Sequence, residues 1–115
     1  MLGWWITINR ASDPRETKVA SWEASLGGDD WPNHLVECGQ ASQVQFNGYP
    51  NRYEARAANV IPVIEHGPPP HAGPMVIGDD YVSDGGWSRD FTLNADVASR
   101  CSPDEVLIID VWDQS

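Results

Sequence analysis

One segment near the carboxyl end of the sequence, Glu105 to Trp112, constrains the fold more than any other. Side chains alternate between the two sides of an extended strand. Both sides of this segment are aliphatic, with Val106 and Ile108 on one and Leu107 and Ile109 on the other. A strand with two apolar sides is typical of a central position, where helices or a second layer cover it on each side. The segment therefore predicts a central strand that is buried on both faces.

Turn-forming residues divide the rest of the chain into short segments of strand or helix character. Strands are expected over residues 4–9, 17–22, 43–46, 52–57, 75–77 and 91–93, in addition to 105–112. Helices are expected between residues 30 and 38, over 60–66 and over 95–100. A chain of 115 residues is long enough for one hydrophobic core. The pattern predicts a single α+β domain spanning residues 1–115, with a mostly antiparallel sheet of about six or seven strands and three short helices.

Each expected helix follows a residue whose side chain accepts hydrogen bonds from free backbone amides. Asp29 or Asp30 would cap the first helix, Asn59 the second and Asn94 the third. Pro62 is then expected in the first turn of the second helix, where its missing N–H leaves no hydrogen bond unmade. These residues predict where the three helices begin.

The charge of the chain narrows the classes of partner. Seventeen acidic residues against seven Lys and Arg give a formal net charge of -10. Nucleic acids and anionic membranes require a basic footprint, so direct binding to either is not expected. The excess is concentrated in residues 79–115, which hold nine acidic residues and two arginines. Solubility alone, or a halophilic origin, would also produce an acidic surface.

The amino-terminal sequence and the cysteine content indicate a cytoplasmic protein. The first residues lack the basic and apolar regions of a signal peptide, and no apolar run is long enough to cross a bilayer. Cys38 and Cys101 are the only cysteines, one expected in each of two helices. Without export, both are expected to be reduced, buried thiols rather than a disulfide.

Two groups of side chains have the chemistry of metal ligands. His66 and His71 flank three prolines next to Glu65, but the rigid proline segment spreads the two imidazoles apart. His34 and Cys38 are four residues apart on one expected helix, so they share a face. Neither group has the further ligands nearby in the sequence that a zinc site requires. No metal and no other cofactor is therefore expected.

The sequence gives little support to calcium binding or catalysis. Asp79, Asp80 and Asp84 lie among glycines, but their spacing does not match the alternating oxygen ligands of an EF-hand. The chain contains no nucleophile elbow, no glycine-rich phosphate loop and no cysteine in a recognisable catalytic context. We therefore expect a binding protein rather than an enzyme.

Six tryptophans are unusual in a chain of this length. Several are expected to pack within strands or a helix: Trp4, Trp22, Trp112 and Trp31. Trp87 falls in a loop, where it either folds back over the edge of the core or remains an exposed anchor for a protein partner. Tyr49 and Tyr53, near the tip of the second expected hairpin, leave the same two alternatives open.

The loop over residues 78–90 combines acidic and aromatic side chains. Such a surface suits a basic protein partner, because it steers the encounter and occupies a site meant for phosphates. The residues expected to bind this partner are Asp79, Asp80, Tyr81, Asp84, Trp87 and Asp90. The leading hypothesis is a small acidic inhibitor that binds and blocks a basic protein. It would be either the immunity protein of a nuclease-type toxin or a phage-type inhibitor of a host nucleic-acid-handling defence system.

Two other classes of protein stay open. One is a small-ligand or metal-binding domain, with or without enzyme activity, that uses the His- and Pro-rich loop over residues 66–71. The other is a homodimer whose Trp and Tyr side chains are buried between the two copies. An inhibitor predicts a salt-weakened association with a basic protein. A metal site predicts stoichiometric metal, and a homodimer predicts a doubled mass in solution.

Overall fold

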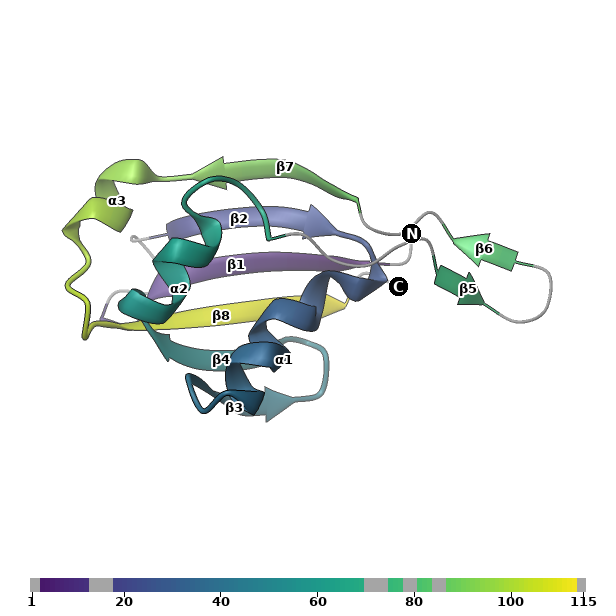
Figure 1. Ribbon diagram of the computed structural model, residues 1–115, viewed down its shortest axis with the longest axis horizontal. Coiled ribbons are helices and arrows are strands. Elements are labelled where there is room, and N and C mark those ends of the chain that lie inside the picture. The colour runs from purple at the N-terminus through teal and green to yellow at the C-terminus, as the bar shows by residue number, and fades with distance from the viewer. Residues whose placement is uncertain (1–2, 13–17, 70–74, 78–80, 84–86, 114–115) are drawn as a thin grey trace.

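The protein is built on one main sheet and a separate small hairpin, shown in Figure 1, a computed structural model that describes residues 3–12, 18–69, 75–77, 81–83 and 87–113. The strands of the main sheet are β1 (Trp4–Arg10), β2 (Lys18–Ala24), β3 (Ala41–Phe46), β4 (Asn51–Arg56), β7 (Ser88–Leu93) and β8 (Val106–Asp113). The hairpin consists of β5 (Met75–Ile77) and β6 (Tyr81–Ser83). The helical segments are η1 (Leu26–Asp29), α1 (Asp30–Glu37), α2 (Ala57–Ile64) and α3 (Ala95–Arg100).

The main sheet has six strands in the order β3-β4-β8-β1-β2-β7, and every neighbouring pair is antiparallel. This arrangement confirms the predicted α+β class, with an antiparallel sheet and three short α-helices. β8 lies between β4 and β1, so the apolar segment near the carboxyl end does occupy a central position. No described helix exceeds eight residues, and none is long and apolar enough to cross a membrane.

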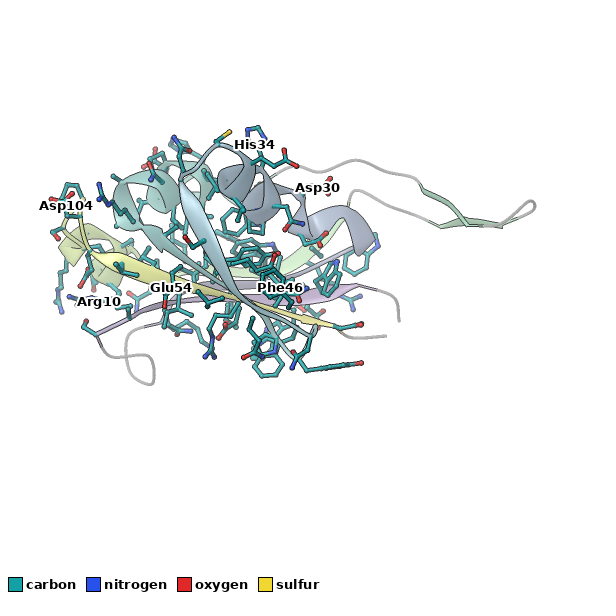
Figure 2. The ribbon with its side chains drawn as sticks, turned by 90° about the horizontal axis from the view of Figure 1, so that it is seen from below. Arg10, Asp30, His34, Phe46, Glu54 and Asp104 are labelled. Atoms are coloured by element: carbon teal, nitrogen blue, oxygen red, sulfur yellow. The ribbon has the colours of Figure 1, made fainter. Side chains whose placement is uncertain are left out.

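Helices α1 and α2 lie over one face of the main sheet, which we call the covered face (Figures 1 and 2). Trp22 of β2 is buried on this face, with its ring centroid 5.9 Å from that of Trp31 and 5.5 Å from that of Phe91. The side chains that β8 directs to this face are fully buried: Leu107, Ile109 and Val111. The hydrophobic core therefore lies between the sheet and these helices.

The opposite face, which we call the open face, carries no helix in the part of the chain that the structure describes (Figure 2). The predicted burial of β8 on both sides is therefore wrong for this side. Val106 is 41% exposed, and Ile108 is half-buried. In the sheet register Ile108 has Asn9 on one side and Glu54 on the other, so neighbouring side chains replace the expected second layer.

Helix α2 begins at Ala57, three residues earlier than predicted. Asn59, the predicted cap, therefore lies within the first turn, and Pro62 lies in the second turn rather than the first. The backbone amides of Ala57 and Ala58 donate to carbonyl oxygens of the segment before β8, at 2.8 and 3.0 Å. Because this distant segment satisfies the first amides of the helix, α2 needs no side-chain cap.

The other two helices begin close to the predicted positions. Asn94 caps α3, because its side-chain oxygen accepts a hydrogen bond from the amide of Val97 at 3.3 Å. Asp29 occupies the cap position of α1, although its side chain makes no capping hydrogen bond. Its carboxylate instead accepts from the side chain of Asn33 at 3.4 Å. Local capping residues thus located α1 and α3 correctly.

The prediction of two buried thiols is wrong for Cys38, and Cys101 is only partly buried. Both cysteines are free, and Cys38 is exposed. α1 ends at Glu37, which leaves Cys38 in the exposed turn that follows the helix. The thiol of Cys101 follows α3 and donates to the carbonyl of Val97 at 3.3 Å.

Candidate interaction surface

Four strands of the main sheet begin or end together at one end of the molecule. In the sheet register Trp4 is opposite Asp113 and Ala24, and Ala24 is in turn opposite Ser88. The turn between β3 and β4 reaches the same place, because the amide of Asp113 donates to the carbonyl of Gly48 at 2.8 Å. We call this region the aromatic end, after the side chains that it carries: Trp5, Phe46, Tyr49, Trp87 and Trp112.

Three of these aromatic side chains are substantially exposed to solvent. Phe46 is 73% exposed, Tyr49 61% and Trp5 37%. Trp5 lies directly across from Trp112 on the open face, so two indoles occupy neighbouring strands. Large exposed aromatic side chains mark protein-binding surfaces more often than free surface, because they bury much area with few rotatable bonds.

Sequence reasoning missed Phe46, and also Val44 beside it on β3. The alternation from Gln43 to Phe46 suggests that Val44 and Phe46 face the core. In the structure the register of β3 shifts between Gln43 and Gln45, and β3 is the edge strand of the sheet. The register shift and the edge position leave both apolar side chains exposed. Neither the shift nor the edge position can be predicted from the local sequence.

Trp87 is half-buried and folds back against the edge of the core, whereas its role as an anchor for a partner stays a prediction. Its carbonyl accepts a hydrogen bond from the amide of Ser25 at 3.0 Å, which ties the segment to the end of β2. A Cβ atom added to Gly3 would lie 3.5 Å from the indole, so the ring packs against the backbone there. The guanidinium of Arg89 stacks over the ring at 4.9 Å from its centroid.

The other residues expected to bind a partner are only partly within the described chain. Asp79, Asp80 and Asp84 lie outside the described residues. Tyr81 is the first residue of β6, where its backbone pairs with that of Ile77. Asp90 is exposed on the edge strand β7 and has a φ of 55°, at a shift in the register with β2.

The β5–β6 hairpin projects beyond the aromatic end of the main sheet (Figure 1). Its two strands pair only with each other. In the sequence, residues 78–80 connect the two strands and contain two of the predicted aspartates. The hairpin therefore extends the molecule in the direction of the aromatic end.

Three arginines are held in ion pairs between elements distant in the sequence. Their atoms approach closely: Arg10 Nη2 and Glu105 Oε1 at 2.5 Å, Arg52 Nε and Asp110 Oδ1 at 2.7 Å, and Arg89 Nε and Glu23 Oε2 at 2.6 Å. The arginine hydrogen bond holds the pKa of Glu105 below its usual range, so this carboxylate stays ionised. Outside these three pairs the chain has fourteen carboxylates and only four cationic side chains.

Further charged residues lie at both ends of the sheet. Arg56, at the end of β4, and Arg100, at the end of α3, lie far from the aromatic end. Asp29 and Asp30 follow β2 at the aromatic end, and Asp113 ends β8 there. Figure 2 shows Asp104 near one end of the molecule and Asp30 well away from that end. Both ends therefore carry carboxylates, since Asp96 and Asp104 lie at the far end with Arg56 and Arg100. The aromatic end differs by the exposed rings beside its carboxylates.

Two acidic residues of the last third of the sequence do not add to this surface. Arg10 neutralises Glu105, which lies at the far end, just before β8. Arg52 neutralises Asp110, which is only 8% exposed in the middle of the open face. The acidic surface is therefore smaller than the charge count of residues 79–115 suggests.

Among the described residues, each group of potential metal ligands consists of only two side chains. Cys38 Sγ lies 3.6 Å from His34 Nε2, as expected for residues four apart on a helix. His66 Nε2 lies 3.5 Å from Glu65 Oε1, whereas His71 is outside the described residues. Among the described residues no three His, Cys, Asp or Glu side chains gather into a possible metal site.

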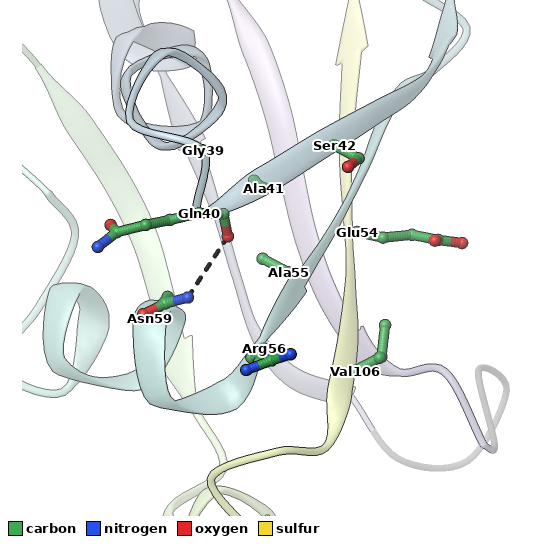
Figure 3. Close-up of a pocket in the computed structure, with 9 residues that line it drawn as sticks. All are labelled: Gly39, Gln40, Ala41, Ser42, Glu54, Ala55, Arg56, Asn59 and Val106. Carbon is green, nitrogen blue, oxygen red and sulfur yellow. Dashed lines mark hydrogen bonds between the residues drawn. The ribbon is translucent and has the colours of Figure 1, made fainter.

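An open pocket of about 500 Å³ lies near the far end of the molecule, between the β3–β4 hairpin and the start of α2 (Figure 3). Within its lining the side-chain amide of Asn59 donates to the carbonyl of Gln40 at 3.5 Å. Glu54 and Arg56 place opposite charges at its rim, so it has no single electrostatic preference. The pocket is separate from the aromatic end.

Comparison with known protein families, curated proteins and solved structures finds no match for this chain. What the protein binds is therefore inferred from its surface. The feature that distinguishes this surface is the acidic, aromatic end of the sheet, where exposed rings and carboxylates lie together. Such a combination is chemically suited to cationic and planar groups of a protein partner.

Proposed function

We propose that this protein binds and blocks a basic protein partner through its aromatic end. The observation that carries the proposal is the gathering of exposed aromatic rings and carboxylates at the end of the sheet opposite Arg56 and Arg100. The proposed partner is a nucleic-acid-handling protein. Two biological settings suit it: an immunity protein paired with a nuclease-type toxin, and a phage-type inhibitor of a host defence system.

Electrostatics supports a basic partner in two ways. A net charge of -10 accelerates encounter with a cationic surface and repels nucleic acid from the same surface. A carboxylate such as that of the exposed Asp30 at the aromatic end would occupy a position that a phosphate takes in a basic cleft. The protein would then block its partner by occupation alone, with no catalytic group of its own.

Aromatic side chains would supply the buried contact area of the complex, which charged side chains alone do not provide. Phe46 and Tyr49 together expose most of two rings beside the turn between β3 and β4. Interface hot spots are enriched in Trp, Tyr and Arg, because these side chains fill pockets and exclude water. The exposed rings would therefore fix the register of a complex that the carboxylates attract.

The β5–β6 hairpin also supports the proposal by its shape. It projects beyond the aromatic end, and Asp79 and Asp80 lie between its strands in the sequence (Figure 1). A projecting hairpin with aspartates in its connecting sequence suits insertion into a cleft built for a nucleic-acid strand. The proposal includes a cytoplasmic location, since both settings concern nucleic acid inside a cell.

Charge reversal tests the proposal. The intact chain would be measured by biolayer interferometry against basic proteins encoded beside its gene, and each partner's nuclease activity would be assayed with and without it. Replacing Asp79, Asp80 and Asp84 with Lys is expected to slow association by roughly tenfold at low salt. It should also weaken inhibition.

The matched control places the same change in net charge at the far end, by replacing Glu54, Asp96 and Asp104 with Lys. All three side chains are exposed, and no hydrogen bond or ion pair of their side chains joins them to other described residues. This control should slow association much less than the hairpin variant. Equal slowing by both variants, or an absence of binding to any basic protein, would contradict the proposal.

A further inference from the structure

Lys18, the only lysine of the chain, lies over an exposed indole of the open face. Its Nζ is 5.6 Å from the centroid of the Trp5 ring. Lys18 is the first residue of β2, whereas Trp5 is opposite Glu23 near the end of that strand. Its side chain therefore extends along the face to reach the ring. No carboxylate oxygen of the described residues lies within 4.0 Å of it.

A second cation at the aromatic end is held much more firmly. The guanidinium of Arg89 stacks over Trp87 at 4.9 Å and also makes the 2.6 Å ion pair with Glu23. Two indoles at this end thus already accept a cation on the ring face. One cation is anchored by a carboxylate, whereas the ring is the contact that the described residues offer Lys18.

We propose that the face of Trp5 is a binding site for a Lys or Arg side chain of the basic partner, and that Lys18 holds this site until the partner displaces it. The proposal rests on the proposed function. Exposed cation–π contacts are weak, so an intramolecular ammonium exchanges readily for an incoming one. A guanidinium competes well, because it is planar and stacks on an aromatic ring.

The surroundings of Trp5 favour this site over the other rings of the aromatic end. Trp112 is its neighbour on β8 and Glu23 its neighbour on β2, all on the open face. An incoming cation would meet two aromatic side chains and, on the far side, a carboxylate already paired with Arg89. The ring face of Trp87 is less available to an incoming cation, because Arg89 is held over it.

A pair of variants that remove one positive charge each tests the proposal. Lys18→Met keeps the length of the side chain but empties the ring face of charge. Arg100→Met makes the same change in net charge on α3, far from Trp5. The dissociation constant of a short oligo-arginine peptide would be measured by calorimetry at low salt. Lys18→Met should bind about two- to fivefold more tightly than Arg100→Met.

Replacing Trp5 supplies the second arm of the experiment. Trp5→Leu should bind the peptide more weakly than wild type, and adding Lys18→Met to it should give no tighter binding than adding Arg100→Met. Thermal unfolding of each variant would show that the fold is intact. Equal affinities for Lys18→Met and Arg100→Met overturn the Trp5 site while leaving the proposed function intact. If the peptide does not bind wild type at all, both proposals fail.

Discussion

The two faces of the main sheet use the same residue types in opposite ways. On the covered face, Trp22 is buried against Trp31 and Phe91 beneath the helices. On the open face, Trp5 and Trp112 lie on neighbouring strands with no helix of the described chain above them. The role of a tryptophan in this protein therefore depends on which side of the sheet it occupies.

The open face is stabilised by polar contacts where the covered face is stabilised by apolar packing. Thr7 and Asp110 are both nearly buried on the open face, although no helix covers them. Arg52 reaches across from β4 and bonds both carboxylate oxygens of Asp110, at 2.7 and 3.2 Å. A bidentate pair of this kind both neutralises and shields the buried carboxylate. On this face, polar side chains that bond one another thus take the place of a covering helix.

The largest expected effect belongs to the covered face. Trp22→Ala should lower the free energy of unfolding by about 3–5 kcal/mol, because it leaves a cavity beneath the helices. Trp5→Ala removes an indole of the same size from the open face, where it is 37% exposed, and should lower the same free energy by only about 1–2 kcal/mol. Urea denaturation of both variants measures the two values. Comparable losses would show that the two faces are not as different as their exposures indicate.

A smaller effect is expected from breaking the ion pair of the open face. Arg52→Gln leaves the nearly buried carboxylate of Asp110 without its cation and should cost about 1–3 kcal/mol of stability. Arg56→Gln is the control, since Arg56 is exposed on the same strand and makes no ion pair with the described residues. Its unfolding free energy should change by less than about 0.5 kcal/mol. Similar midpoints in urea for the two variants would contradict the importance of the pair.

The covered face should also respond to alkaline pH. Burial raises the pKa of Tyr53 to about 12, and its hydroxyl donates to the Asn33 side chain at 2.7 Å. Because the folded pKa lies above the unfolded value of about 10, the contribution of Tyr53 is complete below pH 10. It should be lost progressively as the pH rises from 10 through 12. Unfolding measured across this range should show a smaller pH dependence in Tyr53→Phe than in wild type.

The smallest effect on stability is expected at the exposed edge of the sheet. Phe46→Ser should change the unfolding free energy by less than about 0.5 kcal/mol, because the ring of Phe46 is mostly in contact with water. The same substitution should weaken binding of a basic partner, since it removes an aromatic contact from the aromatic end. Thermal unfolding and biolayer interferometry on one preparation separate the two effects. A large loss of stability would mean that Phe46 belongs to the core.

Much of the architecture was predictable from local sequence. The apolar segment near the carboxyl end predicted the central strand β8, and Asn94 predicted the start of α3. Both are local signals: a run of side chains that needs a hydrophobic environment, and a side-chain oxygen that accepts from an amide three residues later. Such local effects favour the same secondary structure whatever the rest of the chain packs against.

The surface proposed to bind a partner was only partly predictable. The sequence indicated Trp87 and the acidic loop around it, but not Phe46 or the position of Trp5 on an open face. Nor did it indicate that Glu105 is neutralised by Arg10, 95 residues away in the chain. These features depend on register and on pairs that form only after the strands assemble.

The sequence by itself determined the α+β class, the central strand and the starts of α1 and α3, because alternation, turns and caps act over a few residues. Only the tertiary structure decided which face of the sheet the helices cover, where α2 begins and which acidic side chains remain free of arginine. Periodicity tells which side chains share a side, but not what lies against that side. In this protein the unoccupied side and its aromatic end are where we propose that function resides.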